Sequence, residues 1–406
     1  MKDPKMLRAV HPPADFDSAV ADCAAMVARE AAPAWVTEAR RLALRNYLAQ
    51  GLPGRKDEAW KYTPFRNWLA QPHLTRAASS ALYAPAQVKA QTLADSGELA
   101  RPLFGAETDP LLQLNQALAV DFRVLTIAAG VGVDEPIYLH HEAPGAGAMT
   151  HGMTLLRLEP DARATLVELV SAPQDGFSTH RLRIDLMPRA RLHHIRIAEG
   201  SGAGLALWLD RADIAAHGTY AYTAVHACAA AMAVQADLRL HGEGAEAHTA
   251  AATLGAGRSH ADWRARVSHF GPQTISRIHA RSVLGGESFA AVQGCVSVAP
   301  AAQNTDSHQL AKALLVSPQA RAVHKPELEI FADDVKCGHG ATIGSLNPDQ
   351  LFYLRARGIA EAEARQMLLA AFVGGIADDA PEGQVRDLIT EAIARNLPRV
   401  LGEAAS

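Results

Sequence analysis

The amino-acid sequence predicts a mainly β protein whose strand-rich core is flanked by α-helical segments at both ends. Three observations support this fold class. Apolar and polar side chains alternate with a period of two through the middle of the chain, glycine and proline turns divide that stretch at short intervals, and helical periodicity is confined to the two ends. We therefore expect a helical region over residues 1–100, a β core over 101–343 and a second helical region over 344–406.

The first region contains two segments with helical periodicity, residues 15–29 and 34–50. In the second of these, one face carries an apolar stripe that consists of Trp35, Ala39, Leu42, Ala43 and Tyr47. A glycine–proline cluster then ends the helix. The next stretch, residues 54–68, concentrates charges and aromatic rings, and we interpret it as a surface turn anchored by Trp60 and Phe65.

The middle region shows the clearest alternation. Its cleanest run is Met232, Val234, Ala236, Leu238 and Leu240, and comparable runs begin at Leu182, Leu205, Trp263 and Val292. Alternation over such lengths indicates strands with one face buried. No helical pattern convincingly interrupts these strands, which argues against a doubly wound sheet. A sandwich, a barrel and a stacked β-solenoid remain open, because no strict sequence repeat decides among them.

The last region returns to helical periodicity. Residues 347–350 (Asn-Pro-Asp-Gln) form a good helix start, with a capping side chain, proline at the first helical position and glutamine three residues after asparagine. Gly358 is well placed to end this short helix. A second helix is expected over residues 360–376. A third should start near Pro381 and carry an apolar face of Val385, Leu388, Ile389, Ala392 and Ile393.

Composition and charge exclude several classes of protein. The formal net charge of −4 creates no basic field that would attract nucleic acid or an anionic membrane. The most apolar stretch, residues 227–234, is far shorter than the roughly 20 residues of a membrane span. The charged start, followed by prolines, is unlike a secretory signal peptide. The cysteines are scattered without a CxxC pair, so we expect a cytoplasmic protein without disulfides; they are Cys23, Cys228, Cys295 and Cys337.

The most suggestive chemical motif is Lys336-Cys337-Gly338-His339-Gly340. In extended backbone, Cys337 and His339 face the same side, within reach of one soft metal. One thiolate and one imidazole do not complete a four-coordinate site, so further ligands would have to come from elsewhere or from a partner chain. By contrast, the two side chains in each adjacent pair, His140-His141 and His193-His194, should point to opposite faces of a strand, so neither pair is suited to bind one metal ion together.

Other catalytic motifs are missing from the sequence. There is no GxxxxGK[ST] loop, so we expect no nucleotide bound by this chain itself. Neither a GxSxG elbow nor an HExxH helix is present. These chemistries therefore find little support in the sequence.

Four stretches of the sequence resemble the SufB/SufD family of iron–sulfur cluster assembly proteins. The most specific is residues 326–372, which contains KCGHGAT and resembles the family's C-terminal signature. Residues 260–284 and 304–326 look like the strand-rich core of the family, and GRKDEAWKYT, residues 54–63, is similar to the motif that precedes the core in SufD members.

This resemblance implies an architecture and a set of partners. The implied core is a right-handed parallel β-helix between helical segments. The implied partners are a SufB homologue, which forms a heterodimer with this chain, and SufC, an ABC-type ATPase docked on the C-terminal helices. Phe352, Tyr353, Arg357 and Gly358 are expected to shape the SufC docking surface. The chain itself would be a non-catalytic scaffold, since ATP would be hydrolysed by SufC.

One position favours the SufD branch of the family. SufB members typically carry Q-C-D-S where this sequence reads Asn304-Thr305-Asp306-Ser307, and Thr305 cannot supply a thiolate. The family implicates the histidine of the KCxHGAT motif, here His339, at the SufB–SufD interface. A transient iron–sulfur cluster shared with SufB is therefore implied at His339. Cys337 is either a second ligand or a buried strand cysteine.

Alternative functions come from different classes of protein. The chain could be the paralogous SufB-type scaffold, which Thr305 argues against, or a β-solenoid carbohydrate-active enzyme, which should turn over substrate alone. A structural adaptor that contributes no ligand is a third alternative. A homodimer in the absence of SufB is also left open by the sequence.

Overall fold

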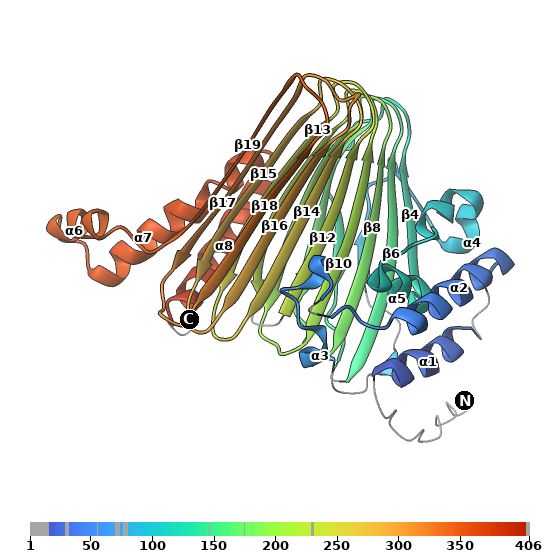
Figure 1. Cartoon of the computed structure of the whole chain (residues 1–406), viewed down its shortest axis with the longest axis horizontal. Helices are drawn as coiled ribbons and strands as arrows, with labels where there is room; N and C mark the ends of the chain where they lie inside the picture. The colour runs from blue at the N-terminus through green and yellow to red at the C-terminus, as the bar shows by residue number, and fades with distance from the viewer. Residues whose placement is uncertain are drawn as a thin grey trace.

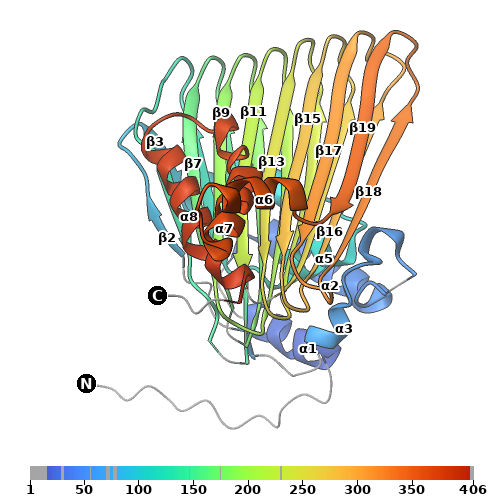
Figure 2. The same ribbon diagram turned by 90° about the vertical axis from the view of Figure 1, so that its left-hand side faces the viewer.

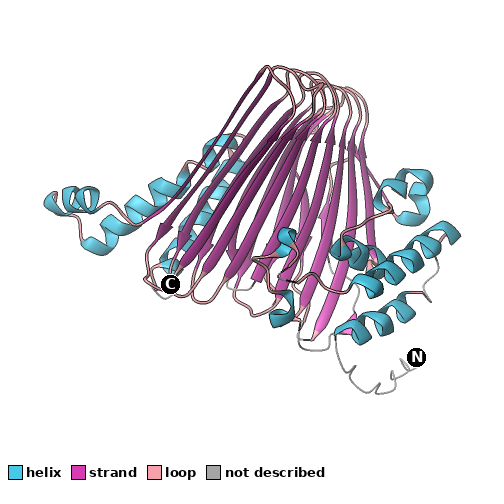
Figure 3. Ribbon diagram, viewed as in Figure 1, coloured by secondary structure: helices cyan, strands magenta, loops and turns pink. Residues whose placement is uncertain are grey.

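The computed structural model describes residues 16–28, 32–54, 56–69, 74–75, 80–145, 147–173, 175–228 and 231–402. Its centre is a long β-solenoid of about eight coils, with helices at both ends of the chain packed on its outside (Figures 1 and 3). The helix predicted over residues 15–29 is observed as α1 (Phe16–Val27), and the expected end residues Asp15 and Arg29 lie outside the described residues.

Two sheets form the walls of the solenoid, and successive strands of the chain alternate between them. Sheet A contains β3 (Val88–Gln91), β4 (Asp121–Ile127), β6 (Ala148–Leu158), β8 (Phe177–Leu186), β10 (Leu205–Ile214), β12 (Ala231–Leu240), β14 (His260–His269), β16 (Phe289–Val298) and β18 (Arg321–Ile330), with β1 (Leu74–Thr75) beside β6. Sheet B contains β2 (Ser80–Tyr83), β5 (Ile137–His141), β7 (Arg163–Ser171), β9 (Arg191–Gly200), β11 (Thr219–Cys228), β13 (Glu246–Gly255), β15 (Ile275–Leu284), β17 (Thr305–Leu315) and β19 (Val335–Gly344).

The pairing of the strands decides among the three architectures that alternation left open. From β4 to β19, every strand pairs in parallel with the strand two positions away, so that Phe177, Leu205 and Ala231 lie side by side in consecutive coils. A barrel would close one sheet on itself, and an antiparallel sandwich would use hairpins. Parallel pairing between successive coils identifies a β-helix, as the family resemblance implied.

Tight turns that lead from sheet A to sheet B stack into a ladder along one edge of the solenoid. Each carries one residue in the left-handed region, with φ between 55° and 64°: Asp161, Arg189, His217, Gly244, Gln273 and Asn304. The backbone N–H of each donates to a carbonyl oxygen of the next coil at 2.6–3.0 Å. The unusual backbone conformation therefore aims one amide along the solenoid axis and helps to fix the register between coils.

Both faces of the central strands are buried, and this corrects one expectation from the alternation. The alternation predicted strands with one buried face, whereas in β10 both faces are covered: Leu205, Leu207 and Leu209 pack outward beneath the N-terminal helices. Ala206 and Trp208 face the interior of the solenoid instead. Alternation predicted the strand correctly, but it could not tell which of two buried faces is the interior.

The N-terminal region is less purely helical than the sequence indicated. Helices α1 and α2 (Ala34–Gln50) form as expected, but β2 and β3 add antiparallel strands to the first coil. Within the expected β core, helix α5 (Pro110–Leu118) packs on β6 and β8. The sequence Asp109-Pro110 is a typical helix start. In the structure, Asp109 accepts a hydrogen bond from the Leu111 amide and Pro110 occupies the first turn. Short helical segments complete this region: η1 (Glu58–Trp60), α3 (Phe65–Trp68), α4 (Leu93–Ser96) and η2 (Gly97–Leu103).

Residues 56–69 cross the outer face of sheet A as a strap. Trp60 and Phe65 are buried and anchor it, as the sequence predicted. The strap is also tied to strands far away in the chain, because the Thr63 hydroxyl donates to Asp262 on β14 and Lys325 on β18 forms an ion pair with Glu58 at 2.6 Å. The GRKDEAWKYT motif therefore holds the N-terminal region against the later coils.

The C-terminal helices follow the predicted pattern closely. Asn347 caps α6 (Pro348–Ala356), and Gly358, with φ of 86°, follows its end. Helices α7 (Glu361–Gly374) and α8 (Gln384–Val400) pack on the outer face of sheet B, and η3 (Ala377–Asp379) joins them (Figure 2). Among the described residues, no helix combines the length and the apolar character needed to cross a bilayer.

Two buried histidines make the fold sensitive to acid: His151 lies on the outer face of sheet A beneath helix α5, and His226 lies in the solenoid interior. Burial lowers the pKa of His151 and His226 to about 3, and the charge of Arg196 adds to the effect at His226. In the unfolded chain both would titrate near pH 6.5. As pH falls below this value the unfolded state binds protons first, so stability is lost between about pH 6.5 and pH 3.

We expect the acid sensitivity to decrease in a His226→Gln variant. Between pH 7.5 and pH 5.0, a neutral buried histidine costs about 2 kcal/mol of stability, because only the unfolded state becomes protonated. Urea unfolding at both pH values, followed by circular dichroism, measures the difference. If wild type and variant lose the same stability on acidification, His226 does not remain neutral in the folded protein.

Candidate functional site at the open end of the solenoid

Cys337 and His339 lie on β19, the last strand of sheet B. In register, Cys337 lies beside Ser307 and His339 beside Gln309, two side chains of β17 that are buried. Residues in register on neighbouring strands point to the same side of a sheet. Both motif residues therefore follow the interior side of sheet B, with Cys337 half-buried against the interior core and His339 exposed. This is the shared face that the sequence predicted.

Both sheets end without a partner at this site. Within the described chain, β19 pairs only with β17, and β18 pairs only with β16. Large apolar side chains are exposed beside these edges, with 66% of Phe331, 45% of Ile343 and 40% of Ile330 accessible. Unpaired strand edges and exposed apolar side chains are features that soluble proteins normally cover.

The surroundings of Cys337 favour the protonated thiol. Burial raises the pKa of Cys337, although a hydrogen bond from the backbone of Ser307 acts in the opposite direction. Beneath it, a column of hydrogen-bonded side chains leads into the solenoid. The hydroxyls of Ser307 and Ser276 are 2.7 Å apart, and His269 lies 2.9 Å from Ser276. Cys337 therefore lies in register with Ser307, the end of this polar column, and also packs against the interior core.

The described residues contain no group of three or more His, Cys, Asp or Glu side chains placed to hold a metal ion. Cys337 and His339 can supply at most one sulfur and one nitrogen ligand. A four-coordinate iron would need the remaining ligands from another molecule or from sulfide.

Thr305 has a structural role in this end of the solenoid. It is buried, its hydroxyl donates to the carbonyl oxygen of Ala302 at 2.8 Å, and it lies 3.1 Å from the Thr274 hydroxyl. A cysteine thiol would be a weaker donor in this position.

The predicted docking residues on α6 are mostly exposed. No residue of this helix is buried, and 73% of Phe352 and 58% of Tyr353 are accessible. The Arg357 guanidinium lies over the Tyr353 ring at 5.1 Å, and Gly358 follows. Neither ring anchors the helix to the solenoid, because both are exposed. Helix α6 extends away from the sheets (Figure 1).

A buried ionic cluster in the interior escaped the sequence analysis. Arg196 forms ion pairs with Glu168 at 2.5 Å and with Asp210 at 2.7 Å, and all three side chains are almost fully inaccessible. His141 and His194 also contact Glu168, at 2.9 and 2.6 Å. Their sequence neighbours His140 and His193 lie on the other face, as predicted.

The electrostatics of the cluster depend on Arg196. Burial raises the pKa of Glu168, but Arg196 and the two histidines outweigh it and hold that pKa well below its usual value. At Asp210, burial prevails and the pKa is raised. The sequence feature that could have revealed this cluster is a charged residue at an inward position of an otherwise apolar strand. In the structure, Glu168 and Arg196 lie in register one coil apart.

Comparison with known proteins places the chain in a family. Residues 140–372 match the family model described as SUF system FeS cluster assembly, SufBD core domain. The iron–sulfur cluster assembly protein SufD of Escherichia coli is 26% identical over 390 residues, which cover 87% of this chain and 92% of that protein. A SufBD family protein of Synechocystis is 29% identical over 293 residues, 69% of this chain and 65% of its own.

A SufBD family protein of Mycobacterium tuberculosis is 27% identical over 363 residues, which cover 85% of this chain and 89% of its own. The family match spans more than half of the chain and includes most of the solenoid, Cys337 and His339. This chain therefore belongs to the SufBD family of the SUF iron–sulfur cluster assembly system and is similar to SufD.

Proposed function

We propose that this chain is the SufD-type scaffold subunit of a cytoplasmic iron–sulfur cluster assembly complex. In this proposal it pairs with a SufB homologue through the open end of the solenoid and carries a SufC-type ATPase on its C-terminal helices. It binds no nucleotide and has no catalytic centre of its own. The cluster is cargo that His339 helps to hold while it is assembled.

The open end is the observation that best supports the proposal. The unpaired edges of β18 and β19 can continue into the strands of a second β-helix, whose own edges would be covered at the same time. The exposed side chains of Ile330, Phe331 and Ile343 would be buried there. In the absence of SufB, a second copy of this chain offers the same edges, so we expect the isolated protein to form a homodimer.

The incomplete ligand set supports a shared cluster. His339 is exposed at this end, where an imidazole can reach a ligand group of a partner. SufB would supply the thiolate that Thr305 cannot. Cys337 is the second candidate ligand, and its raised pKa means that a metal would have to displace the proton of its thiol.

Co-expression tests the whole assignment. Tagged protein produced anaerobically with the host's SufB and SufC homologues should yield a stoichiometric complex that contains iron and sulfide. Recovery of the chain without either partner would overturn the proposal and favour an independent solenoid enzyme or adaptor.

Binding of SufC is expected to depend on α6. Replacing Tyr353 by Ala together with Arg357 by Glu should weaken SufC binding at least about thirtyfold, the effect of losing one interface hot spot. Both side chains are exposed, so the fold should be unaffected. Arg258→Glu, in the turn between β13 and β14, is the charge-matched control. Unchanged SufC affinity in the folded double variant, measured by calorimetry, would show that SufC docks elsewhere.

A further inference from the structure

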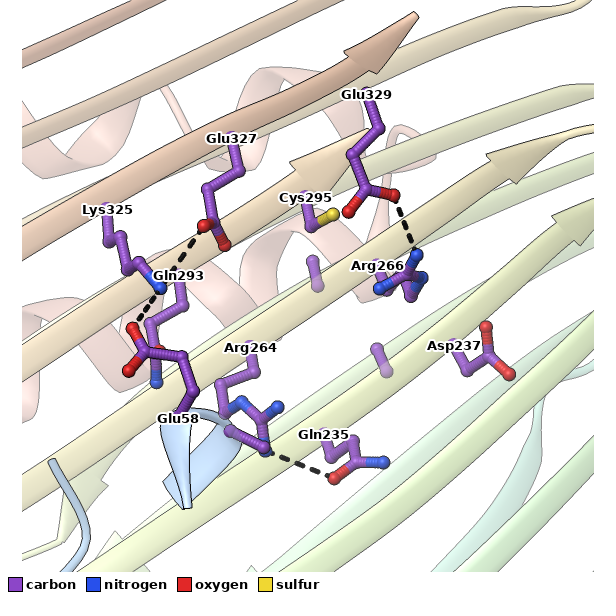
Figure 4. A pocket seen from close by; sticks show the side chains of 13 residues that line it. Glu58, Gln235, Asp237, Arg264, Arg266, Gln293, Cys295, Lys325, Glu327 and Glu329 are labelled. Carbon is purple, nitrogen blue, oxygen red and sulfur yellow. Dashed lines mark hydrogen bonds and ion pairs between the residues drawn. The ribbon is translucent and has the colours of Figure 1, made fainter. Parts of the chain in front are cut away.

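A cavity of about 320 Å³ lies between the strap and the outer face of sheet A (Figure 4). Neither Cys337 nor His339 is among the residues that line it. Glu58 and Ala59 form its strap side, and its floor is made by side chains of β12, β14, β16 and β18. One cross-strand row of this floor contains Gln235, Arg264, Gln293 and Lys325. The volume is at the lower end of the range for small-molecule pockets.

Most charges around the cavity are already paired. Lys325 forms ion pairs with Glu58 at 2.6 Å and with Glu327 at 3.2 Å, and Figure 4 shows its ammonium between the two carboxylates. Arg266 is paired with Glu329 at 2.9 Å.

Asp237, the fourth carboxylate on the lining, is paired with Arg239 at 2.8 Å. Each of the four carboxylates therefore already contacts a cation other than Arg264, and Glu58 and Glu327 share Lys325.

Arg264 is the exception among these cations. Its guanidinium lies 4.5 Å from the centre of the Trp60 ring, and its Nη1 donates to Gln235 at 3.3 Å. Within the described chain, no ion pair joins it to a carboxylate. The neighbouring Asp262 accepts hydrogen bonds from Thr63 and from the Gln293 amide. Several N–H donors of Arg264 are thus available to a ligand.

The environment of Arg264 favours a ligand with negative charge. Burial lowers the pKa of Arg264, and the attraction of Asp262, Asp109 and Glu327 acts in the opposite direction. Cys295 lies on the floor of the cavity in register with Arg266, and burial raises the pKa of that thiol. A thiol that stays protonated does not repel an anion. A planar guanidinium, held by the Trp60 ring, can offer two parallel hydrogen bonds to two oxygens.

We propose that this cavity binds a small molecule through an oxyanion, a phosphate or carboxylate group that Arg264 holds with paired hydrogen bonds. The site is formed by this chain alone and is independent of the proposed assembly with SufB and SufC. Glu58 closes the cavity through its ion pair with Lys325, so the strap forms one wall of the site.

Protection of Cys295 from alkylation tests the proposal on the full chain. Labelling with iodoacetamide is followed by peptide mass spectrometry, with inorganic phosphate in one arm and citrate in the other, at constant ionic strength. At least one anion should slow the labelling of Cys295, and the two arms distinguish a phosphate from a carboxylate ligand. Labelling of Cys337, outside the cavity, should not change.

Variants of Arg264 test whether this side chain binds the anion. In Arg264→Gln, the anion concentration needed to protect Cys295 from alkylation should rise about tenfold or more, because charge-assisted hydrogen bonds are lost. Arg211→Gln removes a cation from the same sheet face outside the cavity. In this variant the anion should protect Cys295 as it does in wild type. If Arg264→Gln fails to fold, Arg264→Lys keeps the charge without the paired donors and should also bind more weakly.

Two results would overturn the proposal. One is the absence of Cys295 protection in wild type by either anion at millimolar concentration. The other is equal protection in wild type and in the folded Arg264 variant, which would indicate general screening of charge.

Discussion

Replacing His339 with alanine is expected to abolish cluster accumulation on the co-expressed SufB–SufC complex without preventing its assembly. His339 is exposed on β19, where its side chain contributes little to packing. Under the proposed function, loss of its imidazole removes a nitrogen ligand from a set that the described residues do not complete alone. Changes of residues that only support metal ligands already lower affinity about 10–100-fold, so loss of a ligand should lower iron and sulfide at least tenfold.

Iron and acid-labile sulfide per purified complex measure this effect. His308→Ala is a matched control, because His308 is an exposed histidine on the adjacent strand. It lies in register with Gly338 and therefore on the opposite face from His339. The control should keep wild-type iron. If His339→Ala does so too, the chain is an adaptor that contributes no ligand there.

Cys337→Ser distinguishes the two interpretations of the cysteine. If the thiolate is a ligand, the serine variant should lose cluster as His339→Ala does. If Cys337 only packs against the interior core, iron and sulfide should stay at the wild-type level.

The largest effect on stability is expected from Arg196→Met. This change keeps much of the side-chain volume but leaves Glu168 and Asp210 as buried carboxylates without their cation. Removing one partner of a buried ion pair typically costs about 3–5 kcal/mol. The midpoint of urea unfolding, followed by circular dichroism and tryptophan fluorescence, should fall accordingly. Two probes are needed because solenoids can unfold in parts.

Two comparisons test the cause of this loss. Arg211→Met removes a partly exposed arginine from an ion pair on the outer face of β10 and should cost no more than about 1 kcal/mol. Adding Glu168→Gln and Asp210→Asn to Arg196→Met removes the unpaired charges and should recover part of the stability. A cost for Arg196→Met no larger than for Arg211→Met would contradict a structural role of the ionic cluster.

Local patterns in the sequence predicted the elements and the principal motif. The run from Met232 to Leu240 indicated a strand, and Asn347 with Pro348 indicated the start of α6, because each depends on a few neighbouring residues. The shared face of Cys337 and His339 follows from extended backbone alone. The β-helix came from resemblance to the family, since alternation is the same in a sandwich, a barrel and a solenoid.

Tertiary structure alone decided which residues from different coils meet. Whether Leu205 or Trp208 faces the interior depends on the helices that cover sheet A. Glu168, Arg196 and Asp210 meet because the coils are nearly equal in length and the walls face each other. Glu58 and Lys325, 267 positions apart, close a cavity between them. Periodicity describes one strand at a time, whereas these contacts depend on the length and stacking of whole coils.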